Sequence, residues 1–213
     1  MPIHQALFVN KFVPTWDVVD THRFQADGST FSLSNLQQND FIIVFAGADT
    51  TSLASTSISG HNIRERGSLN SISYFTSSIV HNSSSTSYSF SFTGNNPDYA
   101  VAIAFRSQNQ PSSYSYQLSA SNTGSGTPNH GNTNISFAVN DLVLLIAWVD
   151  DDDASPMVPP TDSTLASADF AALKGSIGVA FKSIESAGNY SWGSWTTTGT
   201  DDWLADVVKI TGS

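Results

Sequence analysis

Two long apolar runs stand out in the pattern of the chain, and each begins directly after an Asn-Asp pair. FIIVFAGA (41–48) follows Asn39 and Asp40, and LVLLIAWV (142–149) follows Asn140 and Asp141. A continuous apolar run of this length predicts a strand that is buried on both faces. Because Asn and Asp favour turns, each pair is expected to form the turn that starts its strand.

Other segments alternate between apolar and polar residues, which predicts strands with one buried face. TSYSFSFTG (86–94) places Tyr88, Phe90 and Phe92 on one face. YAVAIAF (99–105) alternates large side chains with alanines, so a neighbouring layer is expected to pack closely on the alanine face. Clusters of Ser, Asn, Gly, Thr and Pro lie between the runs and predict the turns of a β-sandwich.

Segments of the second half resemble segments of the first half in the same order. LQQNDFIIVFAGAD (36–49) aligns with FAVNDLVLLIAWVD (137–150), with a constant offset of 101 between the paired residues. Further matches pair 74–78 with 180–184, 87–92 with 189–195, and 95–105 with 199–210. This order predicts an internal duplication with pseudo-repeats at about 31–107 and 132–213. The connector 108–131 is polar but contains the alternating SYSYQLSA, which predicts one strand.

The pattern predicts an all-β protein, a jelly-roll-like antiparallel β-sandwich formed by the two duplicated halves. We expect a single domain over residues 1–213, because a separate half would leave one sheet face uncovered. Two small β domains are the alternative. The segment STLASADFAALKG (163–175) predicts the chain's one helix, with a loop as the alternative. The N-terminal segment with Pro14 predicts an edge strand.

Composition and charge narrow the possible partners. The 213 residues carry a net charge of −10, and only 12% of them are charged. Residues 1–107 have five basic and seven acidic side chains, whereas residues 108–213 have three and eleven. So few basic residues argue against binding to nucleic acid or to an anionic membrane. There is no cysteine, which excludes disulfides and thiolate chemistry within the chain.

Targeting signals are also missing from the sequence pattern. The N-terminal residues lack the basic and apolar regions of a signal peptide, and no apolar run approaches the length of a membrane span. We therefore expect synthesis in the cytoplasm.

Four consecutive aspartates, Asp150–Asp153, follow the second apolar run. A dedicated calcium loop places its ligands at alternating positions around a glycine, whereas adjacent carboxylates point in different directions. We interpret the tract as a solvated loop that ends an aggregation-prone strand, and a Ca²⁺ or intersubunit site is the alternative. No metal-ligand residue and no cofactor-binding residue is predicted.

The sequence predicts no catalytic residue and therefore a protein that is not an enzyme. The two glutamates, Glu65 and Glu185, are expected in loops and not as a carboxylate pair on a sheet face. Asp206 is the one strand aspartate of interest, and it is expected to face outward. The five histidines have no metal-ligand spacing and are expected at surface or turn positions: His4, His22, His61, His81 and His130.

Four of the tryptophans lie in the second half of the chain: Trp148, Trp192, Trp195 and Trp203. On strands, a large aromatic side chain is expected in the core. An exposed tryptophan on a sheet face could instead stack against a sugar, so a carbohydrate-binding face is the alternative.

The Asn-Asp pair before an apolar strand, the stretch ASPMVPPTDST (154–164) and the aromatic-rich C-terminal segment 175–210 carry a resemblance. This order resembles β-rich virion proteins of tailed bacteriophages, in which a Gly-Asp-Leu strand, a Pro-x-Gly-Trp loop and a closing pair of aromatic strands recur. The chain departs from that pattern, because Asn140 replaces the usual glycine and PPTDST lacks Gly-Trp.

The resemblance implies a jelly-roll module that serves as a capsid decoration (cement) protein or as a tail appendage. The uneven charge favours a capsid decoration protein with one docking face and one solvent face, located in the virion and assembled in the host cytoplasm. The implied partners are the major capsid protein and further copies of the chain in a homotrimer. A tail adhesin or carbohydrate-binding module that binds a host-surface glycan is the alternative.

Overall fold

The structure is a computed structural model that describes residues 15–23, 30–49, 51–69, 71–108, 111–122, 126–131, 134–150, 156–171, 175–198 and 202–212. Two five-stranded sheets dominate it. The first sheet has the order β1 (Asp17–Arg23), β8 (Tyr99–Arg106), β3 (Phe41–Ala48), β6 (Ile72–Val80), β5 (Asn62–Leu69). The second has the order β9 (Pro111–Asn122), β15 (Trp203–Gly212), β11 (Leu142–Val149), β13 (Gly175–Ser183), β12 (Thr164–Ala171).

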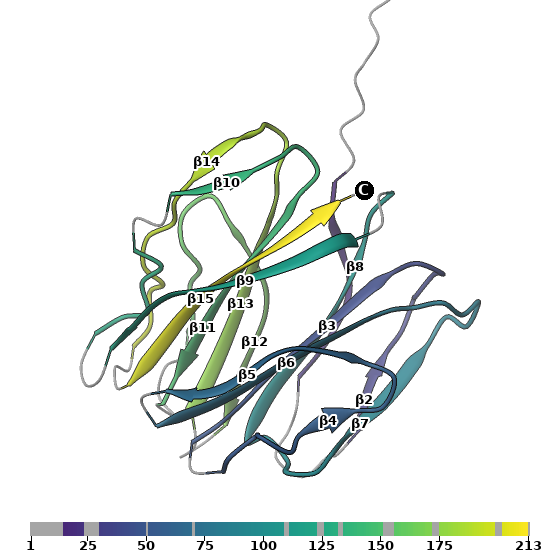
Figure 1. Cartoon of the computed structure of the whole chain (residues 1–213), viewed down its shortest axis with the longest axis horizontal. Helices are drawn as coiled ribbons and strands as arrows, with labels where there is room; N and C mark the ends of the chain where they lie inside the picture. Colours follow the sequence, from purple (N-terminus) through teal and green to yellow (C-terminus); the bar gives the residue numbers. More distant parts are fainter. Residues whose placement is uncertain are drawn as a thin grey trace, which may run out of the picture.

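Each large sheet carries a smaller sheet on its outer face. β2 (Thr30–Leu33), β7 (Tyr88–Thr93) and β4 (Ser57–Ile58) accompany the first large sheet. β10 (Ile135–Phe137) and β14 (Gly188–Tyr190) accompany the second. The two small sheets lie on opposite sides of the molecule, β10 and β14 at one end of the view and β2, β4 and β7 at the other (Figure 1).

The central core lies between the two large sheets. Among the described residues it contains nine side chains from each half, including Phe45 from β3 and Trp148 from β11, whose rings lie 6.3 Å apart. An outer core in each half lies between the large sheet and its small sheet. All eight residues of β3 and all eight of β11 are buried, because each of these strands contributes to two cores.

The predicted fold class, an all-β antiparallel β-sandwich, is confirmed, and every strand pairing that the structure describes is antiparallel. The prediction for 99–105 is also confirmed. Val101 and Phe105 enter the central core, whereas Ala100 and Ala104 pack in the outer core beneath β2 and β7. The strand expected within the connector is β9, and it belongs to the second large sheet.

The predicted helix at 163–175 is wrong. Residues 164–171 form β12, which pairs with β13 from Thr164 opposite Phe181 to Ala171 opposite Gly175. Sheet pairing thus overrides the helix propensity of this alanine-rich segment. Of the N-terminal segment 6–19, in which an edge strand is predicted, residues 17–19 begin β1, which lies at the edge of the first sheet. Pro14 lies outside the described residues.

The two large sheets have the same strand order when β1, β8, β3, β6 and β5 are matched with β9, β15, β11, β13 and β12. Each strand matched by the sequence alignment occupies the corresponding place, as β3 and β11 do at the centres of their sheets. Descent of the halves from one duplicated segment remains a prediction. In the described part of the chain, no helix is long and apolar enough to cross a membrane.

Candidate functional site

The two Asn-Asp turns have the same geometry and lie at the same end of their sheets. Asn39 and Asn140 have φ angles of 79° and 75°, a region that asparagine tolerates better than most residues. In each turn the aspartate carboxylate accepts a hydrogen bond from the backbone N–H three residues earlier: Gln37 donates to Asp40 at 2.7 Å, and Ala138 donates to Asp141 at 2.8 Å. The side chain therefore closes the turn that starts the buried strand.

A basic residue from the corresponding strand neutralises each aspartate. Arg106, at the end of β8, donates to both carboxylate oxygens of Asp40 at 2.8 and 2.7 Å. These hydrogen bonds raise the pKa of Arg106. Lys209, on β15, lies 3.1 Å from Asp141. Asp40 and Asp141 are only 2% and 1% exposed, so each buried carboxylate has a cationic partner.

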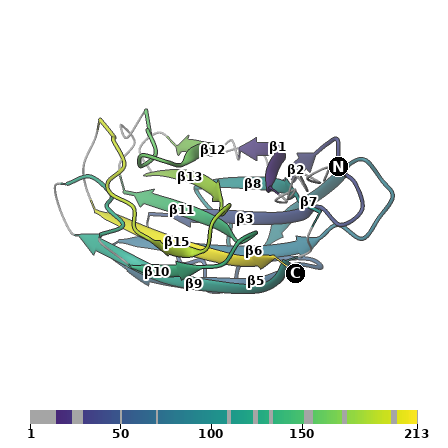
Figure 2. The ribbon, with the colours of Figure 1, turned by 90° about the horizontal axis from the view of Figure 1, so that it is seen from above.

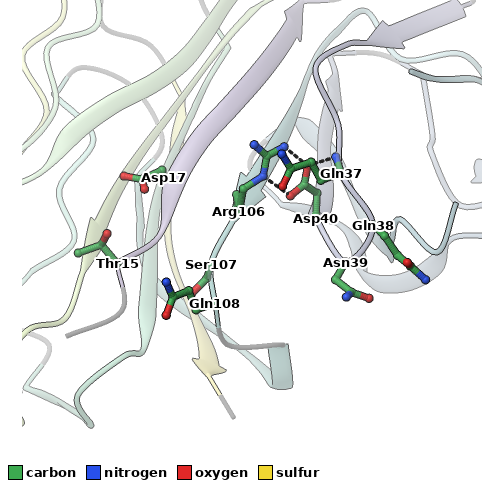
Figure 3. A pocket seen from close by; sticks show the side chains of 9 residues that line it. All are labelled: Thr15, Asp17, Gln37, Gln38, Asn39, Asp40, Arg106, Ser107 and Gln108. Atoms are coloured by element: carbon green, nitrogen blue, oxygen red, sulfur yellow. Dashed lines mark hydrogen bonds and ion pairs between the residues drawn. The ribbon is translucent and has the colours of Figure 1, made fainter. Parts of the chain in front are cut away.

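A polar pocket of about 390 Å³ opens beside the first turn. Figure 3 shows Arg106 and Asp40 at its centre. Its lining consists mainly of amides and hydroxyls: Thr15, Asp17, Gln37, Gln38, Asn39, Asp40, Arg106, Ser107 and Gln108. Such groups donate and accept hydrogen bonds without a large net charge, so the pocket suits a polyhydroxylated or amide-bearing ligand.

A second pocket of about 530 Å³ shares Thr15 and Asp17 with the first and extends toward the second half of the chain. Asp162, Glu185, Lys182 and Tyr190 contribute to its lining. The Lys182 ammonium lies 5.6 Å from the centre of the Tyr190 ring, which therefore has one face covered. Only the second pocket has lining residues from both halves of the chain. We call the two adjoining pockets together the end groove.

The end groove supplies hydrogen-bonding groups but brings together no set of residues with an evident catalytic role. In the residues that the structure describes, no three His, Asp or Glu side chains form a group that could hold a metal ion. The groove depends on segments near residues 15, 38, 106 and 185, which are far apart in sequence. No local sequence pattern could have indicated it.

Core packing is confirmed for the four second-half tryptophans. Trp148, Trp192, Trp195 and Trp203 are at most 7% exposed. The fifth, Trp16, is 2% exposed and donates through its indole to the carbonyl of Asn140 at 2.8 Å. None of the five offers a ring face to a sugar, so these residues do not form the carbohydrate-binding face that was the alternative.

The outward orientation predicted for Asp206 is wrong. Asp206 is fully buried in β15 between Leu204 and Val208, which both lie in the central core. Its carboxylate accepts a hydrogen bond of 2.7 Å from the indole of Trp148. The sequence could have indicated that Asp206 is buried, because the period of two along a strand places it on the same face as the apolar Leu204 and Val208.

Of the histidines expected at surface or turn positions, His81 and His130 lie outside the strands but are buried, at 4% and 0% exposed, so a surface position is wrong for both. His130 accepts a hydrogen bond of 2.9 Å from the indole of Trp195, and burial lowers its pKa to about 3. Burial also lowers the pKa of His61 to about 4. His22 is half-buried against Phe31, and His4 lies outside the described residues.

Aspartates from both halves gather at the end of the sheets opposite the end groove. Asp49 donates through its backbone N–H to the Asp98 carboxylate, and the Asp150 N–H donates to the carbonyl of Asp202. Burial raises the pKa of nearby Tyr99, and the charges of Asp150, Asp98 and Asp49 raise it further. Asp151–Asp153 lie outside the described residues, so the interpretation of this tract stays a prediction.

The loop position predicted for Glu185 is confirmed, whereas that of Glu65 is wrong, because Glu65 lies in the edge strand β5. The two carboxylates belong to different halves of the sandwich and form no pair in the described structure.

Comparison with known proteins identified no relative of the chain. No protein-family model matches the chain, and searches of curated proteins and of solved structures also gave no match. The chain is thus defined by its own features, a double β-sandwich with a polar end groove.

Proposed function

We propose that the chain is a non-enzymatic structural protein of a tailed-phage particle, which binds the capsid shell from outside and stabilises it. The resemblance of the Asn-Asp strand starts and of segment 175–210 to phage virion proteins gives the class of particle. We infer that the outer face of the first small sheet is the docking surface, and its side chains are the structural observation that supports the proposal.

In the described strands β2, β4 and β7, this outer face, which we call the hydroxyl face, contains only serine and threonine side chains: Thr30, Ser32, Ser57, Ser89, Ser91 and Thr93. Cross-strand pairs align them, and Ser32 bonds to Ser89 at 2.9 Å while Ser57 bonds to Thr93 at 2.7 Å. The opposite face of the same strands packs into the first outer core, where the rings of Phe31 and Phe90 stack 5.1 Å apart.

A face of this kind is suited to docking on a large protein surface. It can form hydrogen bonds, and no ionised side chain on it must be desolvated when a partner covers it. It belongs to the half of the chain with a balance of −2, and the half with a balance of −8 lies on the other side of the molecule (Figure 1). The acidic half then faces solvent, where its negative charge disfavours association between decorated particles.

The test is addition of the purified protein to expanded shells that lack decoration, followed by particle imaging. The double variant Ser89→Glu/Ser91→Glu introduces two negative charges into the hydroxyl face and is expected to abolish binding while the protein still folds. The matched control is Asn189→Glu/Ser191→Glu, since Asn189 lies on β14 of the other small sheet, Ser191 follows that strand, and both are exposed. Failure of the wild-type protein to bind any shell, or its location on the tail, would contradict the proposal.

The end groove supports a second candidate, a module that binds a glycan. Its amide and hydroxyl lining could bond to sugar hydroxyls, although the tryptophans first considered for this role are buried. Screening on a glycan array tests this candidate. A specific signal that is lost in Gln38→Ala/Gln108→Ala, two exposed groove residues, would favour it over shell docking.

A further inference from the structure

Two long sides of the sandwich differ in charge, and each has edge strands from both large sheets. β5 and β9 lie together at one side, and β1 and β12 lie together at the other (Figure 2). We call them the β5 side and the β12 side.

The β5 side is the basic side of an acidic protein. β5 contains Arg64, Glu65 and Arg66, a balance of +1, and the sequence of β9 contains no charged residue. The Arg64 guanidinium lies 5.2 Å from the centre of the Tyr114 ring of β9, so its charge is held where the two sheets meet.

The β12 side has the opposite sign. Asp17, Asp20 and Arg23 lie on β1, Asp162 precedes β12, and the sequence of β12 includes Asp169, which gives a balance of −3. Asp17 and Asp162 also line the larger pocket of the end groove, which opens on this side.

Each side also exposes an apolar residue at the corresponding place of its edge strand. Ile63 on β5 is 47% exposed, and Leu165 on β12 is 41% exposed. A register shift follows each of them, between Ile63 and Glu65 in one strand and between Leu165 and Ser167 in the other. Such bulges prevent a long backbone ladder with another strand. A partner on these edges is therefore held by side chains.

We propose that the β5 side of one copy of the chain docks on the β12 side of the next copy. The apolar side chains of Ile63 and Leu165 lie within this contact, and Arg64 faces the carboxylates near Asp162. A contact between two identical sides is disfavoured, because it would place the arginines of β5 together or the aspartates of the β12 side together.

This contact is heterologous, so it forms a closed ring or an open filament. A ring of three would match the homotrimer that the resemblance to phage virion proteins implies. Edge strands of eight residues are about 27 Å long. Two sheet layers of about 10 Å each make the side about 20 Å wide, so it covers about 540 Å² per copy. That area lies below the roughly 800 Å² per partner of stable complexes, so one contact alone is weak and assembly depends on concentration.

The proposal concerns copies of this chain alone and stands independently of shell binding. Its test is sedimentation of the purified full chain over a concentration series up to about 1 mM, at low and at high salt. We expect an oligomer that forms with rising concentration and weakens in high salt. A protein that sediments as a monomer throughout the series would overturn the proposal.

Charge reversal identifies the surfaces. Arg64→Glu and Asp162→Arg should each raise the dissociation constant about fivefold or more, and their combination in one chain should restore association, because every contact then has the pair reversed. Ser89→Glu/Ser91→Glu, which shifts the net charge by the same −2 as Arg64→Glu but lies on the hydroxyl face, should leave association unchanged. A combined variant whose dissociation constant is no lower than those of the single variants would contradict this docking.

Ile63→Ser provides a second variant that does not alter charge. Its side chain is half exposed, so the fold should be retained while association weakens. Thermal unfolding of each variant alone verifies that the monomer is intact. Association unchanged by both Ile63→Ser and Arg64→Glu would exclude the β5 side. Because shell binding is read on particles and self-association on purified protein, either proposal can fail without the other.

Discussion

Three tryptophan indoles donate hydrogen bonds to acceptors far away in sequence. Trp148 donates to Asp206, Trp195 to His130 and Trp16 to the Asn140 carbonyl, with distances of 2.7 to 2.9 Å. A buried indole N–H without an acceptor is costly, so each contact fixes how two segments pack. Two of the acceptors are ionisable side chains, and both lie in environments with little access to water.

Asp206→Ala is expected to destabilise the fold by about 3 kcal/mol, since it leaves the Trp148 indole without this acceptor and opens a cavity in the central core. Asp206→Asn retains an oxygen acceptor of the same size and should cost less. Urea unfolding measures both. Glu185→Ala, at an exposed loop position, is the control and should change stability little. A loss for Asp206→Ala no larger than the control's would mean that the indole bond contributes nothing.

His130 should make stability depend on pH. Its pKa is about 3 in the folded protein and about 6.5 when unfolded, so between these values the unfolded chain binds the extra proton. Its contribution is therefore fully present above pH 6.5 and decreases as the pH falls toward 3, by about 2 kcal/mol at pH 5.

His130→Gln supplies a neutral oxygen acceptor for the Trp195 indole and removes the titration. Unfolding curves between pH 7 and pH 4 should then fall less steeply for this variant than for the wild type. Because carboxylates contribute equally to both proteins, the difference between the curves isolates His130. If stability fell equally steeply with pH in the two proteins, protonation of His130 would not destabilise the fold.

At the scale of elements, the two Asn-Asp turns repeat one device. Each combines a left-handed asparagine, an aspartate that closes the turn and a basic partner from the matched strand. The partners differ in register, since Arg106 ends β8 whereas Lys209 lies within β15 opposite Val143. The turn geometry is therefore shared more closely than the residue that neutralises it.

Replacement of Asn39 or Asn140 by Ala should destabilise the protein by about 1 kcal/mol, because alanine is strained at a positive φ. Replacement by Gly, which adopts this conformation readily, should be close to neutral. Thermal unfolding compares the four variants, with Asn62→Ala at the exposed start of β5 as the control. A loss at only one of the two turns would show that the halves do not depend on this device equally.

These elements also show what the sequence could predict. The buried strands β3 and β11 and the alternating strands β7 and β8 were predictable, because each run's own period indicates which faces are buried. β12 was not, since its alanine-rich sequence favours a helix and only pairing with β13 makes it a strand. The end groove and the pairing of Arg106 with Asp40 depend on tertiary contacts between segments far apart in sequence, which a local pattern does not contain.

At the scale of the whole molecule, the central core connects the halves. Phe45 packs against Trp148, Phe105 packs against Phe181, and the Trp16 backbone N–H donates to the Ser183 hydroxyl at 2.8 Å. Separation of the halves would expose the inner faces of both large sheets to water. Neither half is therefore expected to remain folded when the other unfolds, which is the physical content of the single-domain prediction.

Calorimetry should show one transition whose calorimetric and van't Hoff enthalpies agree. The informative variants are Phe90→Ala, which weakens the outer core of the first half, and Leu145→Ala, which weakens the outer core of the second. In one cooperative unit both variants lower the same transition, by a free energy of about 2 to 5 kcal/mol each. Two small domains would give two transitions, of which each variant moves only one, and that result would overturn the shared-core interpretation in favour of the alternative.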